Sequence, residues 1–304
     1  MHELILHHYP TSPFAEKIRL ALGLKRLAWR SVTIPVIMPK PDLVPLTGGY
    51  RRTPVMQIGA DIYCDTQVIA RELERRCPEP TLYPAGSAGL AHAFAFWSDR
   101  TLFQTAVGLI FGARGDAVPK EFIKDREQLR GAPFDIAAMK ANAPHLRDQL
   151  RAHVGLLEAQ LCDRHFLLGD SPGLADLCAY HPLWFVRNVP AGAGALAASP
   201  RVTAWLERVA ALGHGSPSDL DSGEAIAIAR AAEPATAPSL DADDPHGRKP
   251  GDRVSVAPDD YGRDPVVGEL VASTAHEIAI RRSDPRVGDV VIHFPREGYI
   301  VSTV

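Results

Sequence analysis

The sequence predicts an α/β domain at the N-terminus, an all-helical domain after it and a small all-β module at the C-terminus. Residues 1–77 alternate between strand-like and helix-like patterns, and residues 87–213 have apolar side chains at helical spacing. Residues 250–304 contain five short alternating runs with turn signals at glycines. We expect residues 214–249 to be a linker, because Gly, Pro, Ser and Asp are frequent there.

Composition limits the classes of partner. The 304 residues carry a formal net charge of −3, which disfavours nucleic acid, and 46% of them are hydrophobic, which is ordinary for a globular protein. No stretch approaches the roughly 20 apolar residues of a membrane span, and the N-terminus lacks the features of a signal peptide. Four cysteines without a CxxC spacing favour a reducing compartment. We therefore expect a cytoplasmic protein with no membrane partner.

The first strand and helix carry the first candidate site residue. Leu4-Ile5-Leu6 predicts a strand, and apolar residues at 14, 18, 21 and 22 predict a helix over 13–25. Ser12 suits the N-cap, and Pro13 suits the first helical position. The first amide groups of a helix are unpaired, so a hydroxyl there can help to stabilise a negative charge. By itself, however, Ser12 could serve only as a cap.

Further elements complete the N-terminal domain. A strand is predicted over 29–34, followed by a loop rich in Pro and Gly over 35–50. A hairpin is then predicted from 55–58 and 62–64, with a turn between them. Asp65-Thr66 can start a last helix, which has arginines near its C-terminal end as the helix dipole favours.

This order of elements resembles the N-terminal domain of a glutathione transferase, which has a thioredoxin-like fold. Ser12-Pro13-Phe14 opens the first helix, Thr53-Pro54-Val55 opens the third strand and Asp65-Thr66 opens the last helix. The resemblance is to the serine-type branches, tau-like and zeta-like, and covers about residues 1–213. It implies the glutathione transferase fold, a thioredoxin-like domain followed by an all-α domain. The five strands of residues 250–304 predict an additional SH3-like barrel.

The resemblance implies that glutathione is a co-substrate and that Ser12 is the catalytic residue. Ser12 would donate a hydrogen bond to the glutathione sulfur and would not itself attack. Lowering a thiol pKa from about 8.5 to about 6.5 requires roughly 2.7 kcal/mol, which a helix N-terminus and a charged hydrogen bond supply together. Tyr9 is the rival donor, because some branches of the family use tyrosine, and we favour Ser12.

The resemblance also implies how the peptide is held. A cis bond before Pro54 would expose the backbone of Thr53, which can pair with an extended tripeptide as an added strand does. Asp65 and Thr66 would bind the γ-glutamyl end. Arg52 would meet the glycine carboxylate, with Lys40 as a weaker candidate.

The second substrate is expected to be a small hydrophobic electrophile between the two domains, and the resemblance implies a homodimer. Six aromatic residues in the helical part could contribute to its pocket, although core packing is the favoured interpretation of such a stripe: Phe94, Phe96, Trp97, Phe103, Phe111 and Phe122. Isomerase or dehalogenase chemistry would suit the same scaffold. A non-catalytic binding or scaffold protein, with the β module docking a partner, is the alternative from another class.

Other features favour structural roles. Asp176 is expected to support a helix start, and the scattered histidines show no metal-ligand spacing. Asp259-Asp260 is expected to be a solvated turn rather than a metal or acid pair. Arg281, Arg282, Arg286 and Arg296 are expected to form a solvated face rather than a partner patch. A barrel of about 55 residues is marginally stable alone, so we expect it to dock on the helical domain or on a second subunit.

Overall fold

The computed structural model describes residues 3–187, 189–241 and 244–304. Its N-terminal part contains four strands and three helices: β1 (Ile5–His8), β2 (Ala28–Thr33), β3 (Val55–Ile58), β4 (Asp61–Cys64), α1 (Pro13–Leu24), α2 (Val44–Thr47) and α3 (Thr66–Arg76). β1 is parallel to β2 and antiparallel to β3, which pairs with β4 as a hairpin. The predicted thioredoxin-like order is confirmed, with the short α2 added inside the predicted loop.

The next part of the chain is helical, as predicted. Its α-helices are α4 (Ala88–Trp97), α5 (Phe103–Arg114), α6 (Lys120–Arg130), α7 (Ile136–Ala141), α8 (Ala143–Gln160), α9 (Leu174–Arg187), α10 (Pro190–Ala197) and α11 (Pro200–Ala210). α7 and α10 are short, and they lie where Gly, Pro or Asn interrupt the helical periodicity of the sequence. Residue 188, between α9 and α10, lies outside the described residues.

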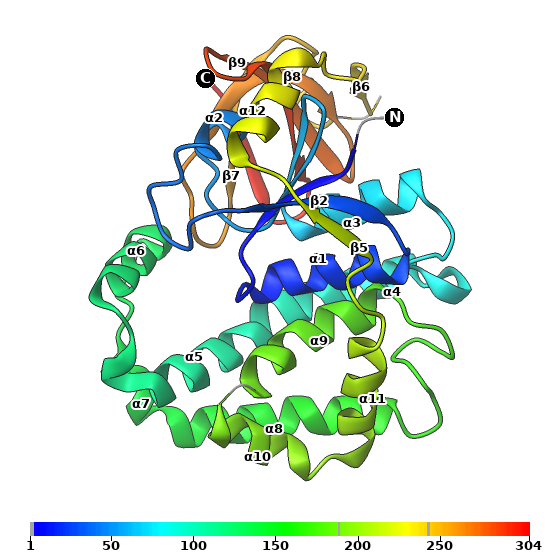
Figure 1. The fold of residues 1–304 in the computed structure, drawn as a ribbon, viewed down its shortest axis with the longest axis vertical. Helices are drawn as coiled ribbons and strands as arrows, with labels where there is room; N and C mark the ends of the chain where they lie inside the picture. The colour runs from blue at the N-terminus through cyan, green and yellow to red at the C-terminus, as the bar shows by residue number, and fades with distance from the viewer. Residues whose placement is uncertain (1–2, 188, 242–243) are drawn as a thin grey trace.

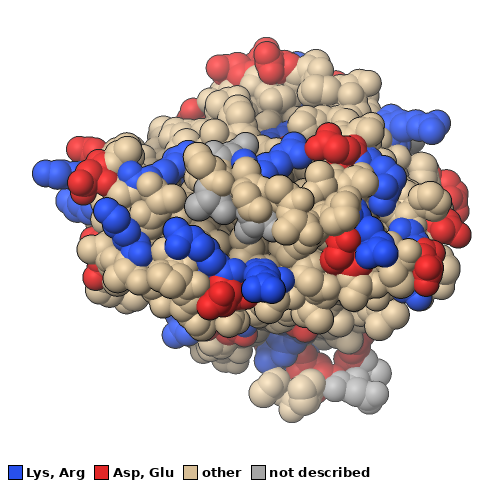
Figure 2. Space-filling model, turned by 90° about the horizontal axis from the view of Figure 1, so that it is seen from below, with Lys and Arg blue, Asp and Glu red and all other residues tan. Residues whose placement is uncertain are grey.

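The helical part fills the lower half of the molecule, and α1 and α3 lie between it and the strands (Figure 1). One hydrophobic core joins α1 and α3 to the helical part and includes Ile18, Ile69, Leu177 and Trp205. Seen from the lower side, Lys and Arg side chains are interspersed with Asp and Glu across this face (Figure 2). None of the described helices has both the length and the apolar composition that a membrane span needs.

Asp176 lies at the start of α9 and is 1% exposed. Its carboxylate accepts hydrogen bonds from the backbone N–H groups of Leu167 and Gly173, at 2.8 and 3.0 Å, and from Trp205 Nε1 at 2.8 Å. These three donors tie the loop before α9 and the α11 helix to one carboxylate, so the structural role expected for Asp176 agrees with its contacts.

Residues 214–249 are more ordered than the predicted linker, apart from 242 and 243, which lie outside the described residues. They contain β5 (Ser216–Asp219), α12 (Ser222–Ala231) and β6 (Ser239–Leu240). β5 extends the sheet as a parallel neighbour of β2, and the Ala225 carbonyl of α12 accepts a 2.8 Å hydrogen bond from Gln57 Nε2 of β3. Their polar composition hid this order, because the segment is held by backbone and side-chain hydrogen bonds to the N-terminal strands.

The five strands predicted beyond residue 250 are all present: β7 (Arg253–Pro258), β8 (Val266–Ser273), β9 (Glu277–Asp284), β10 (Gly288–Pro295) and β11 (Tyr299–Thr303). They are antiparallel in the order β11-β7-β8-β9-β10, and they form the β module expected at this end of the chain. β10 is also parallel to β4. One continuous sheet therefore runs from β11 to β5 through the N-terminal strands.

The expected docking surface for the module was incomplete, because the module contacts the helical part through the Arg100–Asp259 ion pair but has its larger contact elsewhere. The module docks mainly on the N-terminal domain, because β4 would otherwise be an edge strand with unpaired backbone groups, and β10 pairs with that edge. A second hydrophobic core is shared across the junction. Its buried members include Ile5, Val55 and Ile62 from the N-terminal strands and Ile292 and Phe294 from β10.

A charged histidine lies at the β4–β10 junction. His293 is 2% exposed, and its Nδ1 lies 2.6 Å from Glu277 Oε1 while its Nε2 lies 3.2 Å from Asp61 Oδ1. Burial opposes the imidazolium, but hydrogen bonds to Asp61 and Glu277 raise the His293 pKa to about 9. Asp61 also accepts bonds from Ala235 N and Thr236 Oγ1, so one buried cluster connects the module, β4 and the segment before the module.

We expect His293→Gln to remove a pH-dependent part of the stability. A pKa raised from 6.5 to about 9 stabilises the fold below pH 6.5, and this contribution is lost as pH rises through about 9. The contribution corresponds to about 3 kcal/mol at most. Urea unfolding between pH 6 and pH 10 should show a decline in the native protein that the variant lacks.

His276→Gln is the matched control, because His276 is exposed near the same strands. Its unfolding profile should follow the native one across the whole range. Parallel profiles for the native protein and His293→Gln would show that the buried cluster does not hold a proton on His293.

Candidate functional site

Two adjoining cavities, of about 60 and 250 Å³, lie between the N-terminal domain, the helices and the β module. They share Phe14, Arg52, Thr53 and Tyr261 in their walls. Every site residue predicted from the sequence lines one cavity or both: Ser12, Lys40, Arg52, Thr53, Pro54, Asp65 and Thr66. The structure therefore brings together residues from the first helix, the loop before β3 and the start of α3.

Ser12 is the N-cap of α1 and lines the larger cavity. Its side chain is 2% exposed, and its Oγ accepts a 3.2 Å hydrogen bond from Ala15 N. A serine hydroxyl has one hydrogen to donate besides its acceptor positions. The cap therefore uses the oxygen only as an acceptor, and the O–H, which lies at the positive end of the α1 dipole, takes no part in the cap.

Tyr9, the rival donor, lines the same cavity. Burial raises the pKa of its phenol, although the charge of Arg126 and hydrogen bonds with Ser12 and Arg126 oppose this. Tyr9 therefore stays protonated at neutral pH and can donate a hydrogen bond. Ser12 and Tyr9 interact directly, so the two hydroxyls lie together in the wall of this cavity and both remain candidate donors.

The loop before β3 supplies the backbone of the site. The Thr53–Pro54 peptide bond is cis. Lys40 is 3% exposed, and its Nζ donates to Thr53 Oγ1 and to the Arg51 carbonyl, both at 3.0 Å. Burial, with the positive charges of Arg126 and Arg51, lowers the Lys40 pKa to about 8. Lys40 is therefore held beside Thr53 by neutral acceptors, with its charge available to an anion.

The start of α3 forms the floor of the smaller cavity. Asp65 is the N-cap, with Oδ1 accepting from Gln67 N at 3.0 Å, and it adopts φ 97° and ψ 140°. This backbone region is rare outside glycine and is typical of functional sites, where surrounding contacts maintain the strain. Thr66 Oγ1 accepts a 2.9 Å bond from Lys17, which also pairs with Asp99 at 2.6 Å. Burial opposes the Lys17 charge, but Asp99 raises its pKa.

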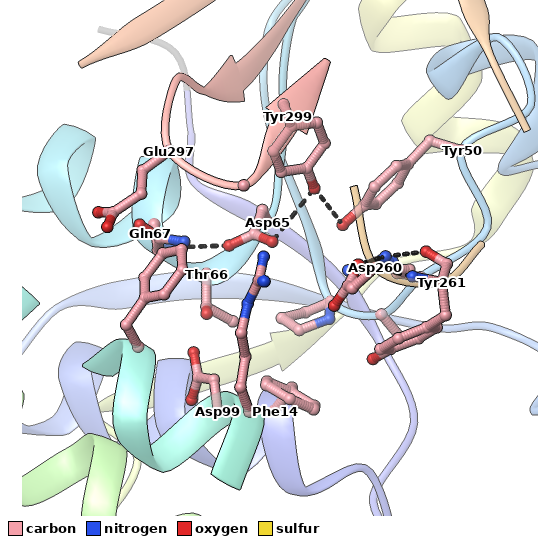
Figure 3. Close-up of a pocket in the computed structure, with 16 residues that line it drawn as sticks. Phe14, Tyr50, Asp65, Thr66, Gln67, Asp99, Asp260, Tyr261, Glu297 and Tyr299 are labelled. Carbon is pink, nitrogen blue, oxygen red and sulfur yellow. Dashed lines mark hydrogen bonds and ion pairs between the residues drawn. The ribbon is translucent and has the colours of Figure 1, made fainter. Parts of the chain in front are cut away.

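Residues of the β module line this cavity beside the start of α3 (Figure 3). The Tyr299 hydroxyl lies between Tyr50 and Asp65 and donates to Asp65 Oδ2 at 3.1 Å. Burial raises the pKa of the Asp65 carboxyl, whereas the Gln67 N–H and the Arg52 charge oppose that shift. One oxygen of the carboxylate expected to bind a γ-glutamyl group is therefore engaged by the module.

Arg52 is engaged by the module as well. Its guanidinium pairs with Asp260, donates to the Tyr261 carbonyl and lies 4.0 Å from the centroid of the Tyr261 ring. The next residue, Gly262 at φ 61°, donates its N–H to the Leu129 carbonyl at 2.6 Å, and a Cβ there would lie 2.9 Å from Leu129 Cδ1. Glycine at 262 thus lets the loop approach α6 closely and hold Tyr261 between the two cavities.

Asp259-Asp260 is only partly the solvated turn that the sequence favoured: Asp259 is 40% exposed, but both carboxylates pair with arginines. Asp259 pairs with Arg100 of the helical part at 2.6 Å, and Asp260 pairs with Arg52. Arginines outside the segment hold both carboxylates, so the turn anchors the module over the cavities. Sequence reasoning also missed Asp99, Tyr261, Glu297 and Tyr299 in the smaller cavity, because no local pattern signals contacts between segments so far apart.

Aromatic rings form much of the larger cavity. Phe103, Phe111 and Phe122 line it, and Phe96 lines the smaller one. Phe111 is also a buried member of a small hydrophobic cluster against which Phe103 and Phe122 pack, so these three rings serve both the core and the cavity. Phe94 and Trp97 do pack against the first hydrophobic core. Phe134 and Phe185, which the sequence prediction did not single out, complete the aromatic wall. The larger cavity can therefore hold an apolar molecule beside Ser12.

The structure gives no geometric support for a metal centre in the part of the chain that it describes, where no three His, Cys, Asp or Glu side chains are arranged as ligands. His7 and His8 have separate partners. His7 Nε2 lies 2.8 Å from Gln57 Oε1, and His8 Nε2 lies 3.0 Å from Ser31 Oγ.

Comparison with known proteins gives matches over both halves of the fold. Residues 6–81 match the description "Glutathione S-transferase, N-terminal domain", and residues 124–208 match "Glutathione S-transferase, C-terminal domain". A solved structure of a GST-like protein from Pseudomonas syringae is 44% identical, with a TM-score of 0.84, and the match covers 100% of both chains. The similarity to this structure therefore includes the β module.

Two further matches concern a protein of Caulobacter. FtsZ-localized protein A from Caulobacter vibrioides is 29% identical over 182 residues, which are 58% of this chain and 74% of that protein. A solved structure of FzlA from C. crescentus is 26% identical, with a TM-score of 0.51, and the match covers 68% of this chain and 87% of that one. The two domain matches and the full-length similarity to the Pseudomonas syringae protein together show that this chain belongs to the glutathione S-transferase family.

Proposed function

We propose that this protein is a serine-type glutathione transferase in which Ser12 activates the thiol of bound glutathione. The observation that carries the proposal is the Ser12 hydroxyl, which caps α1, retains an O–H to donate and lines a cavity walled by aromatic rings. The thiolate attacks an electrophilic carbon of a small hydrophobic substrate and forms a C–S bond. A leaving group departs with its bonding electrons, and the thiol proton passes to solvent.

Glutathione would lie across both cavities. Its γ-glutamyl end would meet Asp65 and Thr66 in the smaller cavity, its cysteinyl backbone would pair with Thr53, and its glycine carboxylate would meet Lys40. Arg52 lies where the cavities join and would contact the peptide there, rather than hold the glycine end as the sequence suggested. We further propose a cytoplasmic homodimer, in line with the family.

Calorimetric titration of the full chain with glutathione tests this function, with thiolate absorbance followed against pH. We expect saturable binding at one site per chain and a thiolate that persists below pH 7. S-methylglutathione is the matched control, because it retains the peptide contacts and lacks the ionisable thiol. Failure of the native protein to bind glutathione would overturn the proposal.

A non-catalytic binding protein is the second candidate. The specific observation in its favour is that the module already binds two residues of the candidate site: Tyr299 donates a hydrogen bond to Asp65, and Asp260 pairs with Arg52. The relative named FtsZ-localized protein A is consistent with a localising role on this scaffold. Titration of Tyr299→Phe separates the candidates: if Asp65 is merely shared, native and variant bind glutathione alike, whereas binding by the variant alone would favour a module that blocks the site.

A further inference from the structure

The larger cavity has charge of one sign. Six cationic side chains line it, and no Asp or Glu does among the described residues: Lys40, Arg51, Arg52, Arg114, Arg126 and Arg130. The smaller cavity differs, since four carboxylates line it together with two arginines. The outer helical face also differs, since acidic and basic groups are interspersed there (Figure 2). The excess of cations is thus a feature of this cavity.

Few carboxylates compensate these cations. Asp125 pairs with Arg51 and with Arg126, and Asp260 pairs with Arg52. Two negative charges against six positive ones leave an excess of four. Within residues 3–187, 189–241 and 244–304, no ion pair joins Lys40, Arg114 or Arg130 to a carboxylate. A positive potential in a partly enclosed, apolar space favours an anionic ligand.

The same cations lie beside aromatic rings. The guanidinium of Arg126 is 4.5 Å from the centroid of Phe122, and that of Arg130 is 5.9 Å from the centroid of Phe134. Arg130 also donates to Gln104 Oε1 at 3.4 Å, a neutral acceptor at the start of α5. Rings that supply apolar contact beside fixed guanidinium donors suit a ligand with an aromatic body and an acid group.

We propose that the second substrate is an aromatic acid, a mostly apolar molecule with a carboxylate or sulfonate held by Arg114 and Arg130. This inference rests on the proposed function, in which Lys40 binds the glycine carboxylate of glutathione. Arg114 and Arg130 come from the last turns of α5 and α6, on the helical side of the cavity and away from the peptide contacts. Arg130 is half-buried and Arg114 is exposed.

Two fluorescent probes with the same ring system test the inference. 8-Anilinonaphthalene-1-sulfonate carries a negative charge, and N-phenyl-1-naphthylamine is neutral. Titrations of the full chain use Arg114→Met, Arg130→Met and the double variant, with Lys124→Met as a matched control. Lys124 is an exposed cation on α6 that does not line the cavity. Methionine keeps the apolar length of the replaced side chain.

The native protein should bind the anionic probe at least about tenfold more tightly than the neutral one. Each arginine variant should lower the affinity for the anionic probe roughly three- to tenfold and leave the affinity for the neutral probe unchanged. Lys124→Met should change neither affinity. Equal affinity for the two probes, or an anionic preference that survives in the double variant, would overturn the inference. The glutathione titration tests the proposed function independently of the probes. The proposed function fails if glutathione does not bind, whether or not the anionic probe is preferred.

Discussion

Removal of residues 250–304 is expected to leave a chain that aggregates instead of folding. The second hydrophobic core is shared, so truncation would expose buried residues of the N-terminal strands, among them Ile5, Val55 and Ile62. It would also free the β4 edge, which β10 pairs from Val291 to His293. An exposed apolar edge strand is a template for pairing between chains. Size-exclusion chromatography and circular dichroism of the truncated chain would measure the loss.

A point substitution tests the same idea without a new terminus. Phe294 is 0% exposed and contacts the rings of Tyr50 and Tyr299. Phe294→Ala should lower the free energy of unfolding by about 3–5 kcal/mol, as expected for a large buried side chain. Ile300→Ala is the control, because Ile300 lies on β11 and is 51% exposed. Ile300→Ala should change the free energy of unfolding by no more than about 0.5 kcal/mol.

Independent folding of the module would give the opposite results. Urea unfolding of the full chain would then show two transitions, the truncated chain would stay monomeric, and Phe294→Ala would shift only the module's transition. A single transition that Phe294→Ala shifts as a whole is expected, because one continuous sheet and one core join the module to the N-terminal domain.

Local signals were enough to predict the elements of the fold and part of the site. Ser12-Pro13 predicted the start of α1, and the structure has Ser12 as the cap with Pro13 as the first helical residue. The five module strands were predictable for the same reason, because alternation and glycine turns are properties of short stretches. Such signals also placed Thr53-Pro54 and Asp65-Thr66 at the starts of β3 and α3.

Long-range pairings were not predictable from those signals. Arg52 and Asp260 are 208 residues apart, and Asp65 and Tyr299 are 234 apart, so neither pair leaves a periodic pattern. The parallel pairing of β10 with β4 is equally non-local. These contacts determine which residues surround the candidate glutathione site. They also explain why Asp260, expected in a solvated turn, lines the smaller cavity.

Replacement of the Ser12 hydroxyl is expected to have the largest effect on chemistry. A hydrogen bond to a charged group contributes about 1.5–3 kcal/mol, so its loss should raise the pKa of the bound glutathione thiol by about one to two units. At pH 6.5 the rate of conjugation should then fall roughly 5- to 50-fold, and much of it should return at high pH. The absorbance of the thiolate against pH and the pH profile of kcat/KM would measure both effects.

Two versions of the change separate chemistry from stability. Ser12→Ala also loses the helix cap that accepts from Ala15 N, which costs about 1 kcal/mol, whereas Ser12→Gly costs only tenths. Both should lose the thiolate equally while differing in unfolding free energy. Glutathione affinity should change little in either, because the peptide contacts lie elsewhere.

Tyr9→Phe decides between the two candidate donors. Tyr9 lines the same cavity and stays protonated, so it is able to take the role assigned to Ser12. If Ser12 is the donor, Tyr9→Phe keeps a low thiol pKa, while both Ser12 variants lose it. The reverse pattern would move the catalytic role to Tyr9 and leave Ser12 as a cap. A thiol pKa raised only when both hydroxyls are removed would mean that the two donors are redundant, because either hydroxyl then suffices to bind the thiolate.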